Sequence, residues 1–451
     1  MTNGRRLAAI ALCAGLVGGL AGLAGDLGAG LDLQRRSAYA PPNGSGSTTQ
    51  ASSAVPTVDA HSARMAAAQD LLSARAAAVQ TKDKSAWMAT VDSPGSAFGQ
   101  RQSVAFDNLI QLPLGQFSYG SVHPAPALAA ARIQQVGPQA WVATFSGSYS
   151  LAGYDRAPRT FDATYTLVDR LEGWRFADDT DGANATQLWD LPGLRVLRRQ
   201  SAILIGNAPE ASMRDYSAIA DAAVRRVSGV WGADWNAQVV IVTPSTTEEF
   251  AKLLLRSADE GLDQVAAITE GVIDPGQPAQ GDRVIINPKA FTALQPNGRR
   301  VVITHELTHV AARSSSTRPV PIWLSEGMAD YVGYSGLDLP RKRVASELLA
   351  LVRQGKGPQA LPAADDFDPS RTTIAPSYSA SWLAVSRLVD RYGQAKVVAF
   401  YRSIAGGLVV DQSVQFDPDA IAEQAFPQSF GVTQAQFVDD WKSYLQTLAN
   451  T

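Results

Sequence analysis

The sequence predicts an α+β protein in which an N-terminal apolar helix and a tether precede two folded domains. The chain has 451 residues, and one hydrophobic core rarely grows to that size, so we expect two domains. Within the first of them, helix-forming stretches come before a series of short strand-like stretches, an order typical of α+β folds. The composition is 45% hydrophobic and 18% charged with a formal net charge of −3. It is that of a globular protein, and it offers no basic field for nucleic acid.

Residues 1–57 are predicted to be an export segment followed by a flexible tether. Arg5 and Arg6 precede an uncharged apolar run over residues 7–25, as in an export signal or a membrane anchor. The run is nearly long enough to span a bilayer, and "SAYA" at residues 37–40 offers a cleavage site. A single anchor with the remaining domains outside the cell membrane and a cleaved signal of a secreted protein both remain open. The Gly/Ser/Pro-rich residues 41–56 then form the tether, and the preference for Arg over Lys favours a bacterial source.

Residues 58–190 are predicted to form an α+β domain. Residues 61–83 carry helical periodicity and strong helix formers, and residues 103–112 look like a second helix. Five stretches rich in aromatic and β-branched residues follow, separated by Gly, Pro or Asp turns, and we predict them to be strands. They are residues 115–122, 131–136, 140–150, 160–169 and 173–178. Such an antiparallel meander after the helices implies a curved sheet that wraps the long helix.

This order of elements resembles the nuclear-transport-factor-like cone fold. The resemblance implies that a small ligand can be held inside the cone. The aromatic residues Trp141, Phe145, Tyr149 and Tyr165 fit an ordinary hydrophobic core more simply than a ligand site.

Residues 195–451 are predicted to be a second, mainly helical domain with a small sheet. Residues 195–206 and 238–244 have strand character, and they flank an amphipathic helix over residues 210–231. Ser245 and Glu248 have the spacing of a capping box that opens another helix. A short apolar strand over residues 282–288 comes shortly before the most informative stretch of the chain.

That stretch is "ITHELTHVAA", residues 303–312, for whose helix we predict Asn297 as N-cap. Only 4 histidines occur in the chain, and His305 and His309 stand four positions apart, on one helical face. Two nitrogen ligands of one zinc ion need that geometry. Glu306 lies about 100° round the helix, where it can reach a water that the metal activates.

A hydrolytic zinc site uses three protein ligands, so a third is needed. The only cysteine, Cys13, lies in the apolar run, and His61 and His123 belong to the other domain. A carboxylate is therefore expected. Glu326 in "PIWLSEGMADYVGY", residues 321–334, follows on a return helix that we predict to begin near Ser325.

Asp330 is one helical turn beyond Glu326, where it could hold the N–H of a ligand imidazole. The alternatives are a helix-start glutamate for Glu326 and a solvated surface aspartate for Asp330.

Together, the sequences "HELTH" and "WLSEGMADY" resemble the gluzincin superfamily of zinc metallopeptidases, the thermolysin-like clan, over residues 195–451. The resemblance implies one Zn²⁺ per chain held by His305, His309 and Glu326, with Glu306 as general base. It also implies an edge strand over the active-site helix, for which residues 282–288 are the candidate.

The chain lacks the later histidine that stabilises the oxyanion in thermolysin itself. Residues 375–393 resemble a helix of small clan members that places a tyrosine near the metal, which makes Tyr378 a candidate for that role. A packing tyrosine fits this position equally well.

We therefore expect an exported, membrane-tethered zinc metallopeptidase that acts on peptide or protein substrates. The alternative is a non-catalytic cell-surface binding protein with a cone ligand-binding domain and a vestigial peptidase fold. Residues 58–190 could serve as a prodomain, a recognition module or an inhibitor.

Overall fold

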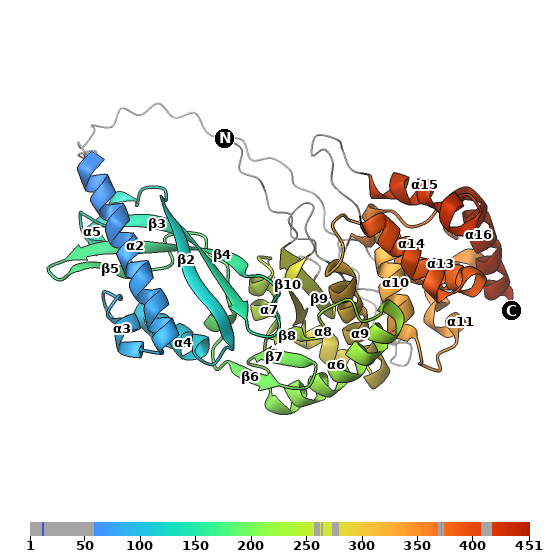
Figure 1. The fold of residues 1–451 in the computed structure, drawn as a ribbon, viewed down its shortest axis with the longest axis horizontal. Helices are drawn as coiled ribbons and strands as arrows, with labels where there is room; N and C mark the ends of the chain where they lie inside the picture. The colour runs from blue at the N-terminus through green and yellow to red at the C-terminus, as the bar shows by residue number, and fades with distance from the viewer. Residues whose placement is uncertain are drawn as a thin grey trace.

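The computed structural model describes residues 11–12, 58–256, 262, 265–272, 279–368, 371, 374–406 and 417–451. The predicted export segment and tether therefore lie outside the described residues, apart from Ala11 and Leu12. In the part of the chain that is described, no helix combines the length and the apolar character that crossing a membrane requires. The α+β class is confirmed: a β-rich N-terminal part precedes a mainly helical C-terminal part (Figure 1).

The N-terminal part is a four-stranded antiparallel sheet with helices packed against it. Its strands follow the order β2-β3-β4-β5, and the long helix α2 lies across the sheet (Figure 1). The elements are α2 (Val58–Thr81), α3 (Lys84–Met88), α4 (Ala97–Leu109), β2 (Leu114–Pro124), α5 (Ala130–Val136), β3 (Trp141–Leu151), β4 (Arg159–Arg170), β5 (Gly173–Asp178) and the 3-10 turn η1 (Leu188–Asp190). We call this part the cone domain.

One predicted strand of the cone domain is wrong, because residues 131–136 form the short helix α5. Ala, Arg and Gln dominate this stretch, and they are good helix formers. None of the α5 side chains is buried. A strand here would therefore have lacked the buried face that normally overrides helix propensity. The other four predicted strands are confirmed.

The second part is built on a six-stranded mixed sheet of order β1-β9-β10-β8-β7-β6. The strands β7, β8 and β10 run parallel to one another, whereas β6, β9 and β1 pair antiparallel with their neighbours. The predicted strand 195–206 is in fact a hairpin of two strands, and the helix predicted between residues 210 and 231 is confirmed as α6 (Glu210–Trp231). The strands are β1 (Ala11–Leu12), β6 (Arg195–Arg198), β7 (Ala202–Gly206), β8 (Val239–Thr243), β9 (Ala267–Val272) and β10 (Gln280–Ile286).

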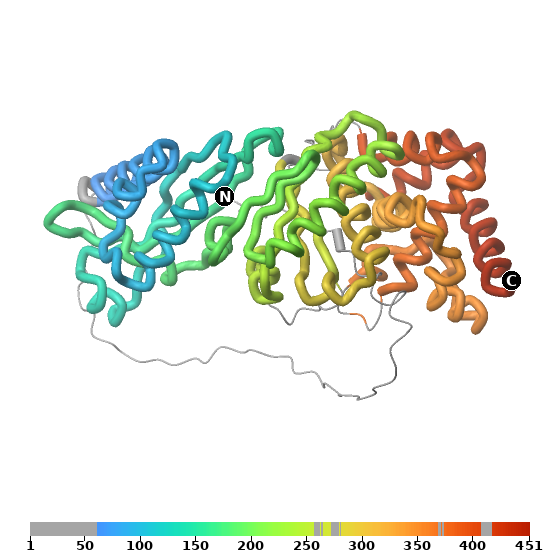
Figure 2. Tube along the Cα trace, turned by 90° about the horizontal axis from the view of Figure 1, so that it is seen from below, coloured from blue at the N-terminus to red at the C-terminus, as the bar shows by residue number. Residues whose placement is uncertain are grey.

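Helices α6 and α9 pack together beside this sheet, and α10 and α13 pack on the far side of α9 (Figures 1 and 2). The helices that follow α6 are α7 (Thr247–Leu253), α8 (Pro288–Ala293), α9 (Pro296–Arg313), α10 (Ile322–Tyr334), α11 (Arg341–Val344), α12 (Ser346–Arg353), α13 (Ala375–Tyr392), α14 (Gln394–Ala405), α15 (Pro418–Phe430) and α16 (Gln434–Asn450), with the 3-10 turn η3 (Ala364–Phe367).

Several predicted helix starts are displaced, among them that of α4, which begins at Ala97 and not at residue 103. The capping box of α7 joins Thr246 to Glu249, one residue later than predicted. Helix α9 begins at Pro296 after the N-cap Gln295, and not after Asn297. Proline has no N–H to lose in the first turn and its φ is already helical, so it starts this helix more readily than the following asparagine does.

The predicted edge strand is also wrong, because β10 is an inner strand. It pairs with β8 on one side and with β9 on the other. The strand next to α9 is β9, which the sequence analysis did not detect, and its second neighbour is the two-residue strand β1.

The cone domain and the sheet of the second part share buried contacts. A single hydrophobic cluster includes Phe106 and Tyr149 of the cone domain together with Ile268 and Ile285 of β9 and β10. Figure 2 shows the sheet lying between the cone domain at one end and the C-terminal helices at the other. The two parts are therefore packed as one body and not merely joined by a linker.

Two ion pairs reinforce this contact. The Arg283 guanidinium of β10 donates to both carboxylate oxygens of Asp155 at 2.6 and 2.7 Å. Arg159 of β4 donates to Glu270 of β9 at 2.6 Å and to the Gly281 carbonyl at 2.7 Å. The cone domain thus holds the β9–β10 hairpin, which lies beside the most conspicuous cluster of ionisable side chains.

Candidate metal site

Helix α9 presents His305, Glu306 and His309 from a buried backbone. Apolar residues surround the helix, including Val301, Val302 and Leu307, so that it is enclosed on all sides. The helix therefore has no separate polar and apolar faces, as is typical of a helix in the interior of a protein. All three ionisable side chains are buried as well.

Helix α10 brings Glu326 to the two histidines. It begins at Ile322, three residues before the predicted start at Ser325. The glycine that follows Glu326 permits a close approach of α10 to α13, since a Cβ on Gly327 would lie 2.4 Å from the Ser381 carbonyl oxygen. This close packing fixes the backbone from which the Glu326 side chain reaches α9.

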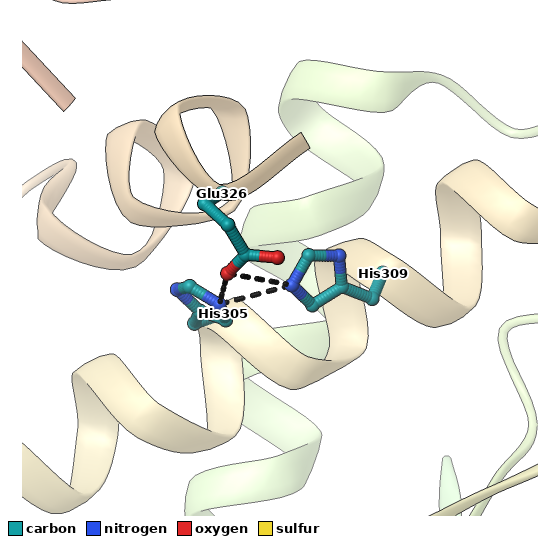
Figure 3. Close-up of side chains that lie close together, drawn as sticks. All are labelled: His305, His309 and Glu326. Carbon is teal, nitrogen blue, oxygen red and sulfur yellow. Dashed lines mark hydrogen bonds and ion pairs between the residues drawn. The ribbon is translucent and has the colours of Figure 1, made fainter. Parts of the chain in front are cut away.

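Three potential ligand atoms converge at one point (Figure 3). The two Nε2 atoms of His305 and His309 are 2.9 Å apart. Glu326 Oε2 lies 3.1 Å from His305 Nε2 and 3.5 Å from His309 Nε2. Ligands about 2.0–2.1 Å from a tetrahedral zinc ion are separated from one another by roughly 3.3 Å. The spacing of the three atoms fits such an ion.

The remaining nitrogen of each imidazole faces a polar partner. His305 Nδ1 is 2.7 Å from Asp330 Oδ1, and His309 Nδ1 is 3.4 Å from Ser325 Oγ. When Asp330 is ionised, it accepts the Nδ1 proton of neutral His305, so that the Nε2 lone pair points toward Glu326. Asp330 therefore lies where a residue that orients a ligand imidazole would lie.

The pKa values show how strongly this cluster attracts a positive charge. Burial by itself lowers the pKa of His305, but the Asp330 and Glu326 carboxylates outweigh it and raise the pKa to about 10. Burial raises the pKa of Glu326, but the two histidines outweigh burial and lower it to about 2. A proton on the imidazoles is one way to satisfy these carboxylates, and a metal cation is the other.

The chain supplies too little positive charge for this site. Glu306, Glu326 and Asp330 are all buried. Among the described residues, the ion pairs of Glu326 and Asp330 are made only with the two histidines. Buried carboxylates without a cation are costly, so the donor set and its charge fit a divalent metal ion.

Glu306 stands beside these atoms with one oxygen held and one free. The buried hydroxyl of Thr269, in β9, donates to Glu306 Oε2 at 2.5 Å. Glu306 Oε1 is buried and has no hydrogen-bond partner within the described part of the chain. A buried carboxylate oxygen normally accepts a hydrogen bond, so Oε1 is available to a water or another donor at the site.

Two tyrosines lie near the site. Tyr378 of α13 is buried with its ring centre 6.4 Å from that of His305, and it also packs edge-on against Phe367. Tyr401 of α14 is buried too, and burial raises its pKa to about 12 although a hydrogen bond with Ser325 opposes this. Tyr378 was a candidate from its place in the sequence, whereas Tyr401 was not predicted.

Three residues around the site were not predicted, namely Thr269, Ser325 as a partner of His309, and Tyr401. Thr269 lies on a strand far away in sequence, and Tyr401 lies beyond the motifs, so no local spacing pointed to either. Ser325 adjoins Glu326 in the same motif, and helical geometry could have found it. His61 and His123 lie on α2 and β2 of the cone domain and take no part in the cluster.

Residues 279–446 match a family model that is described as the Peptidase MA superfamily. The matched segment contains the whole His305–His309–Glu326 cluster, and it is a zincin-like domain of that superfamily. The match does not reach the cone domain, whose resemblance to the nuclear-transport-factor-like fold stays a prediction. No curated protein and no solved structure matches the chain.

Proposed function

We propose that this chain is a zinc-dependent metallopeptidase that hydrolyses peptide bonds in peptide or protein substrates. One observation carries the proposal: the Nε2 atoms of two imidazoles and a Glu326 oxygen converge within 3.5 Å of one another, beside a buried Glu306 oxygen that has no partner among the described residues. The Peptidase MA match over residues 279–446 supports the same class.

His305, His309 and Glu326 would hold the metal, with Asp330 fixing the orientation of His305. A bound zinc ion supplies a Lewis acid that polarises a peptide carbonyl and acidifies water.

Glu306 would act as the general base. Thr269 fixes Oε2 and leaves Oε1 as the atom that takes a proton from the attacking water. The same oxygen can then deliver the proton to the leaving amine. Tyr378 and Tyr401 are the candidates to donate a hydrogen bond to the developing oxyanion.

Metal content tests the ligand assignment. The full chain, purified in zinc-containing buffer and dialysed, should retain one zinc ion, measured by mass spectrometry of the metal. His305→Ala should lose it, and Glu326→Gln should bind zinc more weakly because an anionic ligand is removed. Glu423→Gln removes the same charge from an exposed position on α15 and should behave as wild type. A wild-type chain without zinc, or equal zinc in all variants, would refute the assignment.

The location of the protein is a further part of the proposal. Arg5, Arg6 and the apolar residues 7–25 support export with attachment to the cell membrane through the N-terminal segment. In that state Ala11 and Leu12 would leave their pairing with β9. Protease added outside intact cells should then degrade the folded domains. Full protection of intact protein from that protease would contradict export.

A further inference from the structure

The cone domain contains a cavity of about 600 Å³. It lies between α4, the sheet strands β2 and β4, and the segment that leads into η1. Five aromatic side chains line it, namely Trp87, Tyr119, Phe161, Tyr165 and Trp189. Pockets of this size and apolar character commonly hold small molecules. Of the four aromatic residues that the sequence analysis assigned to the core, only Tyr165 lines this cavity.

The polar groups of the cavity wall are mainly acceptors of hydrogen bonds. Three carboxylates, Asp162, Asp179 and Asp190, face one arginine, Arg101. Arg101 is already paired with Asp178 and Asp179, and none of the ion pairs among the described residues involves Asp162 or Asp190. Gln102 is 4% exposed and its Oε1 has no hydrogen-bond partner there either. The wall therefore has an excess of negative charge and an unsatisfied acceptor.

Asp190 is the carboxylate best placed to attract a cation. It lines the cavity and is exposed to solvent. One oxygen accepts the Gln187 backbone N–H at 2.8 Å, which fixes the carboxylate. It follows Trp189, whose ring lines the same cavity.

A second arginine lies behind two of the rings that line the cavity. Arg75 of α2 is fully buried and does not line the cavity. Its guanidinium lies 4.3 Å from the ring centre of Trp87 and 4.4 Å from that of Phe176, and its Nε donates to Thr90. Trp87 and Tyr165, whose ring centre is 5.1 Å from the guanidinium, both line the cavity, and the two terminal nitrogens of Arg75 have no hydrogen-bond partner within the described residues. The lining rings without such an arginine contact among these residues are those of Tyr119, Phe161 and Trp189, which are therefore the ones left for a ligand.

We propose that the cavity of the cone domain binds a small organic cation, an ammonium group on an apolar or aromatic body. Aromatic ring faces attract such a cation through their quadrupole, and they accommodate its apolar part. Asp190 balances its charge, and Gln102 Oε1 is the acceptor for an ammonium N–H. This inference does not depend on the peptidase proposal, because the cavity and the metal site lie in different parts of the chain.

Three aromatic probes of similar size and different charge test the charge preference. Benzylamine, benzyl alcohol and benzoate are titrated separately into the full chain and followed by calorimetry. Benzylamine should bind at least about tenfold more tightly than either of the others, since a cation–aromatic contact and an opposite charge together exceed 1.4 kcal/mol. Equal binding of the alcohol or the benzoate, or no binding of benzylamine at millimolar concentration, would overturn the proposal.

Asp190→Asn tests the residue that balances the charge. Asparagine has the same size and can still accept the Gln187 N–H, so η1 should be kept. Benzylamine affinity should fall about tenfold while the thermal unfolding midpoint is unchanged. Asp70→Asn makes the same charge change at an exposed position of α2 outside the cavity and should have no effect. Equal losses in both variants, or none in Asp190→Asn, would contradict the assignment.

Discussion

Two clusters of buried charged groups lie along the β9–β10 hairpin, and their difference separates a structural role from a functional one. The domain-contact cluster consists of Asp155, Arg159, Glu270 and Arg283, and each guanidinium meets a carboxylate. The metal-site cluster consists of His305, Glu306, His309, Glu326 and Asp330. There, three carboxylates face two imidazoles, and Glu306 Oε1 has no partner among the described residues.

The chain itself thus balances the charges of the first cluster but not those of the second. Both clusters remove ionisable groups from water, which costs free energy unless partners are supplied. In the first cluster folding supplies them. In the second cluster a proton on an imidazole or a metal cation has to act as the partner, which agrees with a candidate metal site. Asp282 and Arg313 form an ion pair between β10 and the end of α9. It links the strand that carries Arg283 to the helix that carries the two histidines.

The largest expected effect concerns the unpaired oxygen of the metal-site cluster. Glu306→Gln keeps the size of the side chain but cannot take a proton, so hydrolysis in a peptide-library digest should fall about 10²–10⁴-fold. Zinc content and the unfolding midpoint should stay at the wild-type level, because Glu306 is not a ligand in this assignment. The exposed variant Glu423→Gln is the control. If Glu306→Gln still hydrolysed peptides, Glu306 would not be the general base. If it lost zinc, Glu306 would be acting as a ligand.

The domain-contact cluster should respond in stability and not in metal content. Arg283→Met leaves the buried Asp155 carboxylate without its partner, which should lower the free energy of unfolding by about 3–5 kcal/mol. The double variant Arg283→Met/Asp155→Asn should recover part of that loss. Arg214→Met, which breaks the exposed pair with Glu210, is the matched control and should change little.

Urea unfolding and zinc analysis distinguish the outcomes for this cluster. If Arg283→Met were as stable as Arg214→Met, the cone domain would not be held by this ion pair. If it lost zinc while remaining folded, the two clusters would not be separable in function.

The smallest expected effect is a pH dependence confined to the metal-free protein. The pKa of His305 is raised from 6.5 to about 10, so its contribution to stability is fully present below pH 6.5 and is lost as the pH rises through 10. The pKa of Glu326 is lowered from 4.5 to about 2, so its contribution is present above pH 4.5 and is lost as the pH falls through 2. The unfolding midpoint of protein treated with a chelator should therefore decline from pH 7 to pH 10.

Added zinc should reverse that decline, because zinc replaces the His305 proton and binds more tightly as the pH rises. His305→Ala is the control and should lack both trends. If the unfolding midpoint of the metal-free wild type did not change between pH 7 and pH 10, a protonated His305 would be contradicted.

The parts of the site that could be predicted from the sequence are those set by helical periodicity. His305, Glu306 and His309 share one helix, and Glu326 and Asp330 share the next, so that the spacing of each group fixes its face. Helical periodicity also placed α6, and the local enrichment in aromatic and β-branched residues placed the cone strands β2, β3, β4 and β5. It failed for residues 131–136, where the deciding quantity is whether a neighbouring strand buries one face, and that is not a local property.

By itself, the sequence determined which side chains could act as metal ligands and which could act as base, because residue type and helical spacing are local. Only the tertiary structure decided that β9 and not β10 lies beside α9, that Thr269 leaves one oxygen of Glu306 free, and that the cone domain is held against the hairpin. These contacts join residues far apart in the chain. Their free energy comes from burial and charge pairing across elements, which no spacing along the sequence encodes.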